Sequence, residues 1–105
     1  MKTASEFRDG TLALRFIGEL DHHAARGAVR ELERAVDRYL PVSCIVDMSA
    51  LTFMDSSGIA VLLKARRRML ELGGVLRVTG LAGQPGRVIS AAGLERMIDF
   101  DTVSA

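Results

Sequence analysis

Short apolar segments alternate with two long amphipathic segments, and this alternation most constrains how the chain can fold. Apolar side chains recur at spacings of three and four over residues 22–40 and again over about residues 57–72. Each pattern predicts a helix with one buried stripe. Residues 11–17, 42–48 and 75–79 are short and apolar, as strands are. Strands that alternate with helices predict an α/β domain whose sheet has a parallel core.

Turn and capping residues mark the ends of these elements. Asp9-Gly10 favours the tight turn of an antiparallel hairpin, so residues 3–8 are predicted to pair with the strand that follows. Asp21 is a good N-cap for the first helix, and Pro41 stops that helix. Gly73-Gly74 supplies the left-handed end of the second helix.

The remaining segments complete one domain. The continuous apolar run at residues 44–46 predicts a central strand that is buried on both faces. Pro85 fits the first turn of a short third helix that Gly93 ends, and residues 97–100 form a candidate edge strand. A chain of 105 residues supports one core, so residues 1–105 are predicted to be a single domain. Its mixed sheet would have about four or five strands and three or four helices.

Charge and cysteine content limit the classes of partner and the cellular compartment that fit this chain. The 14 basic and 13 acidic side chains nearly cancel, which gives no electrostatic case for nucleic acid or a membrane surface as the main partner. The single Cys44 cannot form an intramolecular disulfide, so a reducing compartment fits. The N-terminus lacks the apolar core of a signal peptide, and no apolar run approaches the ~20 residues of a membrane span. We expect a cytoplasmic protein.

The loop between the central strand and the second helix holds the most informative residues. Asp55 or Ser56 can cap the free backbone amides of this helix. Ser57 would lie in or beside the first turn with its hydroxyl near solvent, and Gly58 would leave space for a partner's backbone or a phosphate. Helix capping alone explains these residues fully. A phosphate here would be favoured by the helix dipole and opposed by Asp55, so a switch is allowed but not required.

Two motifs carry a resemblance to a known family. Residues 51–59, LTFMDSSGI, resemble the signature loop of the STAS domain family, the bacterial anti-sigma factor antagonists. Residues 18–23, GELDHH, are similar to the sporulation subgroup, the anti-sigma F factor antagonists of endospore-forming bacteria. Together with Gly73-Gly74 and residues 90–94, SAAGL, the resemblance covers about residues 5–100.

The resemblance implies a partner-switching function. Ser57 would be phosphorylated by the cognate anti-sigma factor, which is also an ATP-dependent serine kinase, and Asp55 and Ser56 would belong to the same recognition loop with Gly58. The unphosphorylated protein would bind that kinase and displace the sigma factor. Phosphorylation would release it, and a metal-dependent serine phosphatase of the PP2C type would restore it. Such a protein is not an enzyme and needs no cofactor; a monomer is expected, with a dimer as the alternative.

The paired histidines suggest a metal site only at first sight. His22 and His23 are neighbours on a helix and point about 100° apart, and no third ligand follows at zinc-like spacing. We therefore predict no metal. With Asp21, the two histidines are instead expected to shape the start of the first helix and to contact the partner.

The second helix carries a basic run, Lys64, Arg66, Arg67 and Arg68. A solvated helix face explains it, because cations are stabilised toward a helix C-terminus. The alternative is that these residues dock an acidic patch on the kinase.

The sequence gives less support to other functions, and it departs from the family in one feature. Residues 80–86 lack the lysine of a phosphate-binding loop, and Asp47 has no partner in the sequence that would define a general base. The rival hypotheses are a general-stress antagonist, disfavoured by His22-His23, and an accessory domain of a transport system, disfavoured by Ser57.

Relatives usually continue into a C-terminal helix, for which residues 101–105 are too short. The sheet surface under such a helix would then be exposed or covered by a partner.

Overall fold

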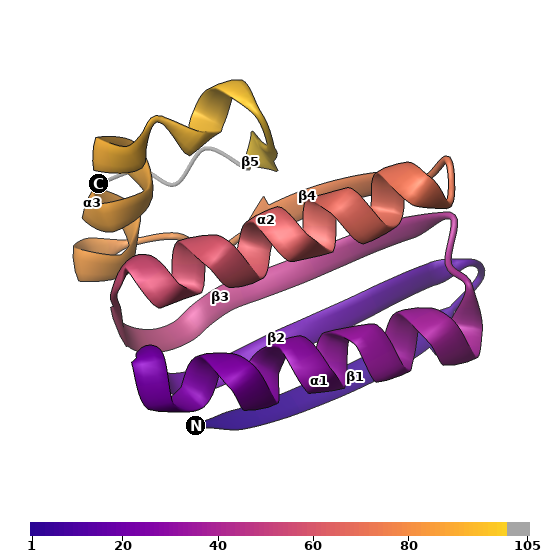
Figure 1. Ribbon diagram of the computed structural model, residues 1–105, viewed down its shortest axis with the longest axis horizontal. Coiled ribbons are helices and arrows are strands. Elements are labelled where there is room, and N and C mark those ends of the chain that lie inside the picture. Colours follow the sequence, from indigo (N-terminus) through magenta and orange to yellow (C-terminus); the bar gives the residue numbers. More distant parts are fainter. Residues whose placement is uncertain (101–105) are drawn as a thin grey trace.

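Five strands form one sheet, and three α-helices connect or flank them (Figure 1). The computed structural model describes residues 1–100. In chain order, these residues form β1 (Lys2–Arg8), β2 (Thr11–Leu20), α1 (His22–Tyr39), β3 (Ser43–Met54), α2 (Ser56–Glu71), β4 (Val75–Thr79), α3 (Gly83–Ala92), a short 3-10 helix (Leu94–Arg96) and β5 (Asp99–Phe100). The prediction of an α/β domain with a mixed sheet is confirmed. Residues 101–105, on which the expectation about a C-terminal helix falls, lie outside the described residues.

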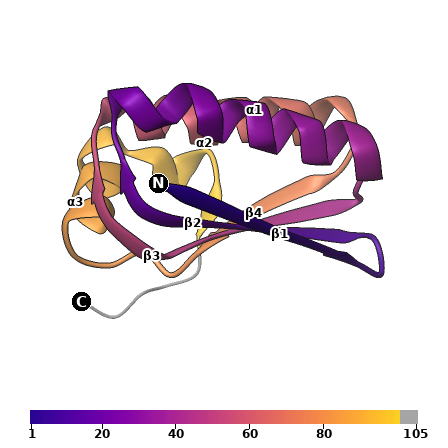
Figure 2. The same ribbon diagram turned by 90° about the horizontal axis from the view of Figure 1, so that it is seen from below.

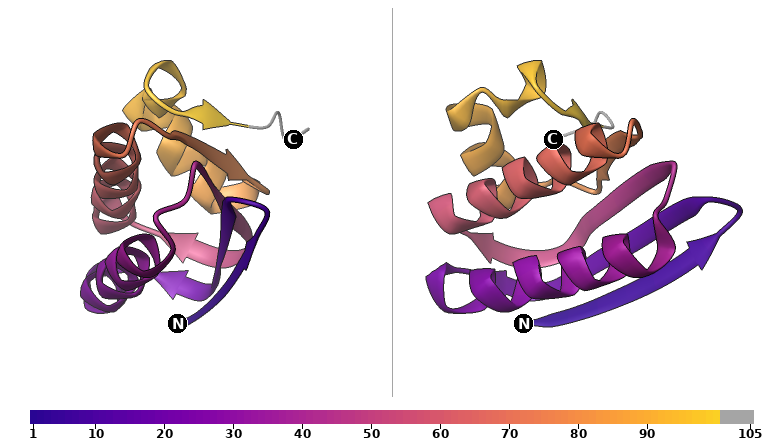
Figure 3. Two further views of the ribbon diagram at one scale, coloured as in Figure 1. Left: turned by 90° about the vertical axis from the view of Figure 1, so that its right-hand side faces the viewer. Right: turned by 45° about the vertical axis from the view of Figure 1, so that its right-hand side comes forward.

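The strands lie side by side in chain order. β1 is antiparallel to β2, and β2, β3, β4 and β5 run parallel to one another. Every crossover therefore advances through the sheet in the same direction. Right-handed crossovers that advance in one direction place their helices on the same face. Figure 2 shows α1 and α2 side by side above the sheet, and the left view of Figure 3 shows both on one side of the strands.

This topology corrects the prediction for β3. Cys44, Val46 and Met48 point toward the helices and are buried, whereas the intervening Ile45 and Asp47 are partly exposed. The strand is therefore buried on one face, not on both as the apolar run at residues 44–46 indicated. A doubly covered sheet needs a reversal in strand order, and the order β1-β2-β3-β4-β5 contains none.

The core lies between the helices and one face of the sheet. Alternate residues of β2 and β3 meet the apolar stripes of α1 and α2, as the periodicity predicted. The largest fully buried side chains include Leu12, Leu14, Phe16, Leu32, Val46, Met48, Leu62 and Met69. The other face carries polar and charged residues, including the ion pair between Arg15 Nε and Asp47 Oδ2 at 3.7 Å. Such a surface can stay in water without a helix above it.

Several predicted boundaries are confirmed. Asp9 and Gly10 both have positive φ, 51° and 82°, as the tight hairpin turn requires. The Asp21 side chain caps α1 by accepting a hydrogen bond from the Ala24 amide at 2.9 Å. The third helix ends at Gly93 in the left-handed conformation. The last strand is shorter than predicted, because the 3-10 helix and a bend occupy the residues before Asp99.

The main difference from the sequence-based expectation is the length of β3. Residues 49–54 were expected in a loop, but β3 continues through them to Met54 beside β2. The pairing is irregular between Arg15 and Ile17 and between Gly18 and Glu19. Such bulges bend and twist strands. Gly18 has φ of 109°, a conformation that other residues rarely adopt. These irregularities hid the strand from the simple period-two pattern.

Candidate functional site

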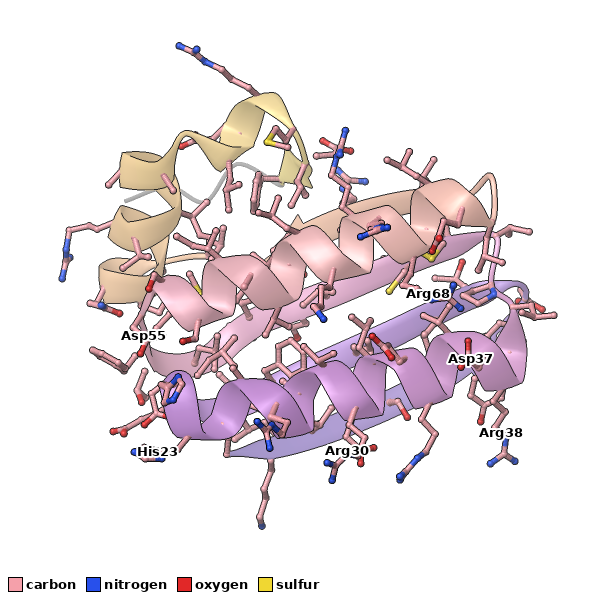
Figure 4. The ribbon with its side chains drawn as sticks, viewed as in Figure 1. His23, Arg30, Asp37, Arg38, Asp55 and Arg68 are labelled. Carbon is pink, nitrogen blue, oxygen red and sulfur yellow. The ribbon has the colours of Figure 1, made fainter. Side chains whose placement is uncertain are left out.

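Two helices begin side by side at the carboxyl edge of the sheet. β2 and β3 are parallel neighbours whose last residues, Leu20 and Met54, are paired in register. Each strand is followed by one aspartate, Asp21 or Asp55, and then by a helix. Figure 4 shows Asp55 at the start of α2 and His23 at the start of α1, at the same end of the molecule. The two segments that were predicted to form the site, residues 18–23 and 51–59, therefore lie together at this edge.

The Asp55 carboxylate caps both helices. Its Oδ1 accepts a hydrogen bond from the Ser57 amide at 2.8 Å, and its Oδ2 accepts one from the His22 amide at 3.1 Å. These amides belong to the first turns of α2 and α1, where backbone donors have no partner within the helix. The sequence predicted a cap by Asp55 or Ser56 for α2 and did not predict the second bond, to a residue 33 positions away.

The same contacts set the charge state of Asp55. Desolvation acts to raise the pKa of this carboxyl, but hydrogen bonds from Ser57 and from the His22 and Gly58 amides outweigh it. The net effect is a pKa below the ordinary value. Asp55 is therefore ionised at neutral pH and places a fixed negative charge between the two helix starts.

The two serines differ in exposure. Ser56 is the first residue of α2 and is exposed, whereas Ser57 is the second and is half-buried. The Ser57 amide donates to Asp55 Oδ1 at 2.8 Å, which places this serine next to the carboxylate. Ser57 thus lies partly exposed at the surface, with a carboxylate close to it.

Gly58 does not leave an open space, so the physical reason given for it is wrong. It is buried, and a Cβ atom at this position would lie 2.3 Å from Met54 Cγ and 3.1 Å from Leu20 Cδ2. The missing side chain makes room for the core residues at the ends of β3 and β2. Gly58 therefore fixes how closely α2 approaches the sheet under the two serines.

His22 and His23 are both exposed at the start of α1. Their rings meet edge to face with centroids 5.8 Å apart. Residues 1–100 contain no group of three or more histidine, cysteine, aspartate or glutamate side chains placed to hold a metal ion. The pair is available at the surface for contact with another molecule.

Gln84, at the start of α3, was missed by the sequence-based reasoning. Its side-chain amide donates to the Met54 carbonyl and accepts from the Met54 amide, both at 2.8 Å. This pair of bonds ties α3 to β3 directly before Asp55. Because Gln84 and Met54 are 30 residues apart, no local motif signals the contact. Phe53 was also missed as a separate site residue, although this residue is 38% exposed and lies two positions before Asp55.

The basic run of α2 is divided between two roles. Arg68 bonds Asp37 of α1 at 2.5 Å and Glu71 at 3.1 Å, and Arg66 Nε donates to the Met97 carbonyl at 2.8 Å. Figure 4 shows Arg68 and Asp37 facing one another from α2 and α1 at the end away from Asp55. Lys64 and Arg67 are exposed, as a solvated face requires. Two of the four residues thus hold elements together.

The fold and the site define a small α/β domain that presents a serine pair where two helices begin. The chain belongs to the STAS domain family, whose sequence profile matches residues 2–105. It is 29% identical over 93 residues to an anti-sigma F factor antagonist of Paenibacillus polymyxa. The matched region covers 89% of this chain and 80% of the relative.

Solved structures share the fold. An anti-sigma factor antagonist from Mycobacterium paratuberculosis has a TM-score of 0.86 and 22% identity, covering 97% of this chain and 86% of that one. The Bacillus cell fate determinant SpoIIAA in its phosphorylated form has a TM-score of 0.72 and 25% identity, covering 96% of this chain and 92% of that one. The predicted STAS-type fold is thus confirmed.

Proposed function

We propose that this protein is a non-catalytic antagonist of an anti-sigma factor and that phosphorylation of Ser57 switches it off. The observation that carries the proposal is the position of Ser57, in the first turn of α2 at an exposed edge where α1 also begins. The Paenibacillus polymyxa relative, named as an anti-sigma F factor antagonist, supports the same assignment. The resemblance of residues 18–23 to the sporulation subgroup supports a role in sporulation. The unphosphorylated protein binds an anti-sigma factor that is also a serine kinase, and the sigma factor is released.

A phosphate at Ser57 changes this surface strongly. It adds about −1.5 to −2 charges at neutral pH. The helix start stabilises the new charge, but the ionised Asp55 repels it. A partner surface that fits the unmodified edge then meets repulsion and uncompensated desolvation, which breaks the complex.

The recognition surface comprises both helix starts. Asp21, His22 and His23 supply the part from α1, and Asp55 and Ser56 supply the part beside Ser57. Gly58 contributes by placing α2 close to the sheet. Phe53 adds an exposed aromatic ring, the residue type that often anchors an interface.

The remaining parts of the proposal concern the cycle and its place. A PP2C-type serine phosphatase removes the phosphate and restores binding. The protein works in the cytoplasm as a monomer. Within residues 1–100, no helix has the length and apolar character needed to span a membrane.

The test is phosphorylation by an anti-sigma factor kinase from the same organism. The chain is incubated with that kinase and ATP, and the modified residue is located by mass spectrometry. We expect one phosphate, on Ser57, in the native sequence and in Ser56→Ala, and none in Ser57→Ala. Phosphate on Ser56, or on neither serine, would contradict the proposal.

A further inference from the structure

Asp55 holds the start of α2 against the junction of β2 and α1. Its backbone amide donates to the Leu20 carbonyl at 3.3 Å, directly before Asp21. Its carboxylate accepts from the His22 amide at 3.1 Å and from the Ser57 amide at 2.8 Å. One residue therefore connects the serine pair with the histidine pair.

A phosphate on Ser57 acts directly on this connection. The Ser57 amide is hydrogen-bonded to Asp55 Oδ1 at 2.8 Å, so a phosphate on the Ser57 side chain is attached close to the carboxylate. The phosphate replaces the hydroxyl proton, repels Asp55 and brings three strong acceptors that compete for the amides of the helix start. The bond from the His22 amide is the longer of the two carboxylate contacts and comes from the other helix.

We propose that Asp55 is a positioning residue that transmits the state of Ser57 to α1: phosphorylation breaks the bond between Asp55 and the His22 amide and so changes how His22 and His23 are presented. The inference rests on the proposed function in taking Ser57 as the modified residue. A partner that contacts both helix starts then detects one phosphate at two places.

The start of α1 also contains a second capping bond that serves as an internal control for the change at the His22 amide. The Ala24 amide donates to Asp21 Oδ1 at 2.9 Å, a bond within α1 that does not involve Asp55. The inference thus predicts a change at His22 with no matching change at Ala24. General fraying of α1 would affect both amides.

The experiment installs phosphoserine at position 57 of the full chain by genetic encoding, so no kinase is needed. Amide exchange and amide-proton shifts of His22 and Ala24 are then measured by NMR. We expect the His22 amide to exchange about five-fold faster, as for one lost net hydrogen bond, and its proton to shift upfield. The Ala24 amide should be unchanged.

Two matched variants isolate the role of Asp55. Asp55→Ala should reproduce the His22 change without phosphate, and phosphoserine at position 57 should add little to it in that background. Phosphoserine at position 90 of α3 is the charge control, because this serine also lies next to a carboxylate: Ser90 Oγ donates to Glu95 Oε1 at 2.9 Å. It should leave His22 unchanged.

An unchanged His22 amide in the protein phosphorylated at position 57 would overturn the inference. So would equal changes at His22 and Ala24, or a His22 response to phosphoserine at position 90. Since the phosphate is installed without a kinase, a His22 response combined with no enzymatic phosphorylation of Ser57 would support the coupling and refute the proposed function alone.

Discussion

The starts of α1 and α2 have similar local structures, but their N-cap residues form different hydrogen bonds. Each follows a parallel strand, and each has an aspartate N-cap with extended backbone, φ −101° at Asp21 and −112° at Asp55. Asp21 accepts its side-chain bond from Ala24 of its own helix, whereas Asp55 accepts from both helices. The comparison teaches that one capping residue can be local and its counterpart can join two elements.

The largest expected difference in stability is between alanine substitutions at the two glycines near these helix starts. Gly58→Ala in α2 puts a methyl group against Met54 and Leu20, and such overpacking costs about 1–3 kcal/mol. Gly27→Ala in α1 meets nothing within 4 Å, so it should stabilise by roughly 0.5–1 kcal/mol through helix propensity. Thermal unfolding should show Tm falling in the first variant and rising in the second. Equal shifts would mean that Gly58 is not packed as described.

A smaller effect should distinguish the two caps. Asp21→Ala removes one capping bond and should cost about 1 kcal/mol, as typical N-caps do. Asp55→Ala removes bonds to two helices, so its Tm should fall further than that of Asp21→Ala. Circular dichroism melting of both variants checks the order. If Asp21→Ala is the more damaging change, the bridging role of Asp55 is wrong.

The sequence could predict each helix start but not the link between them. Asp21 and Asp55 are recognisable as caps because each precedes an amphipathic segment, and Gly73-Gly74 and Gly93 mark helix ends in the same local way. The bond from His22 to Asp55 depends on the register of Leu20 with Met54. That register is set by bulges, which leave no simple periodic signal.

Long-range packing also explains the wrong predictions. Gly58 was predicted to leave open space for a partner's backbone or a phosphate, yet the space beside it is filled by Met54 and Leu20. The face of β3 carrying Ile45 was expected to be covered, but strand order, not local hydrophobicity, decides which face receives the helices. Motifs thus located the site, while its geometry came from contacts between distant segments.

Acid should reduce the difference between Asp55 and an uncharged cap. Because the pKa of Asp55 is lowered on folding from its ordinary 3.8, its ionisation stabilises the fold fully above about pH 4. This contribution is lost as pH falls through the lower folded-state pKa. Asp55→Asn lacks the charge at every pH and has one carbonyl oxygen for two amide donors. Urea unfolding should therefore show the native protein clearly more stable than Asp55→Asn at pH 7.

The two stabilities should converge toward pH 3. The native protein and the variant share the other carboxyl groups with lowered pKa values, Asp47 and Glu95, so their acid loss cancels in the difference. A difference that stays constant from pH 7 to pH 3 would show that the Asp55 charge is not what joins the two helix starts. The geometry of its hydrogen bonds alone would then have to account for the effect of Asp55→Ala.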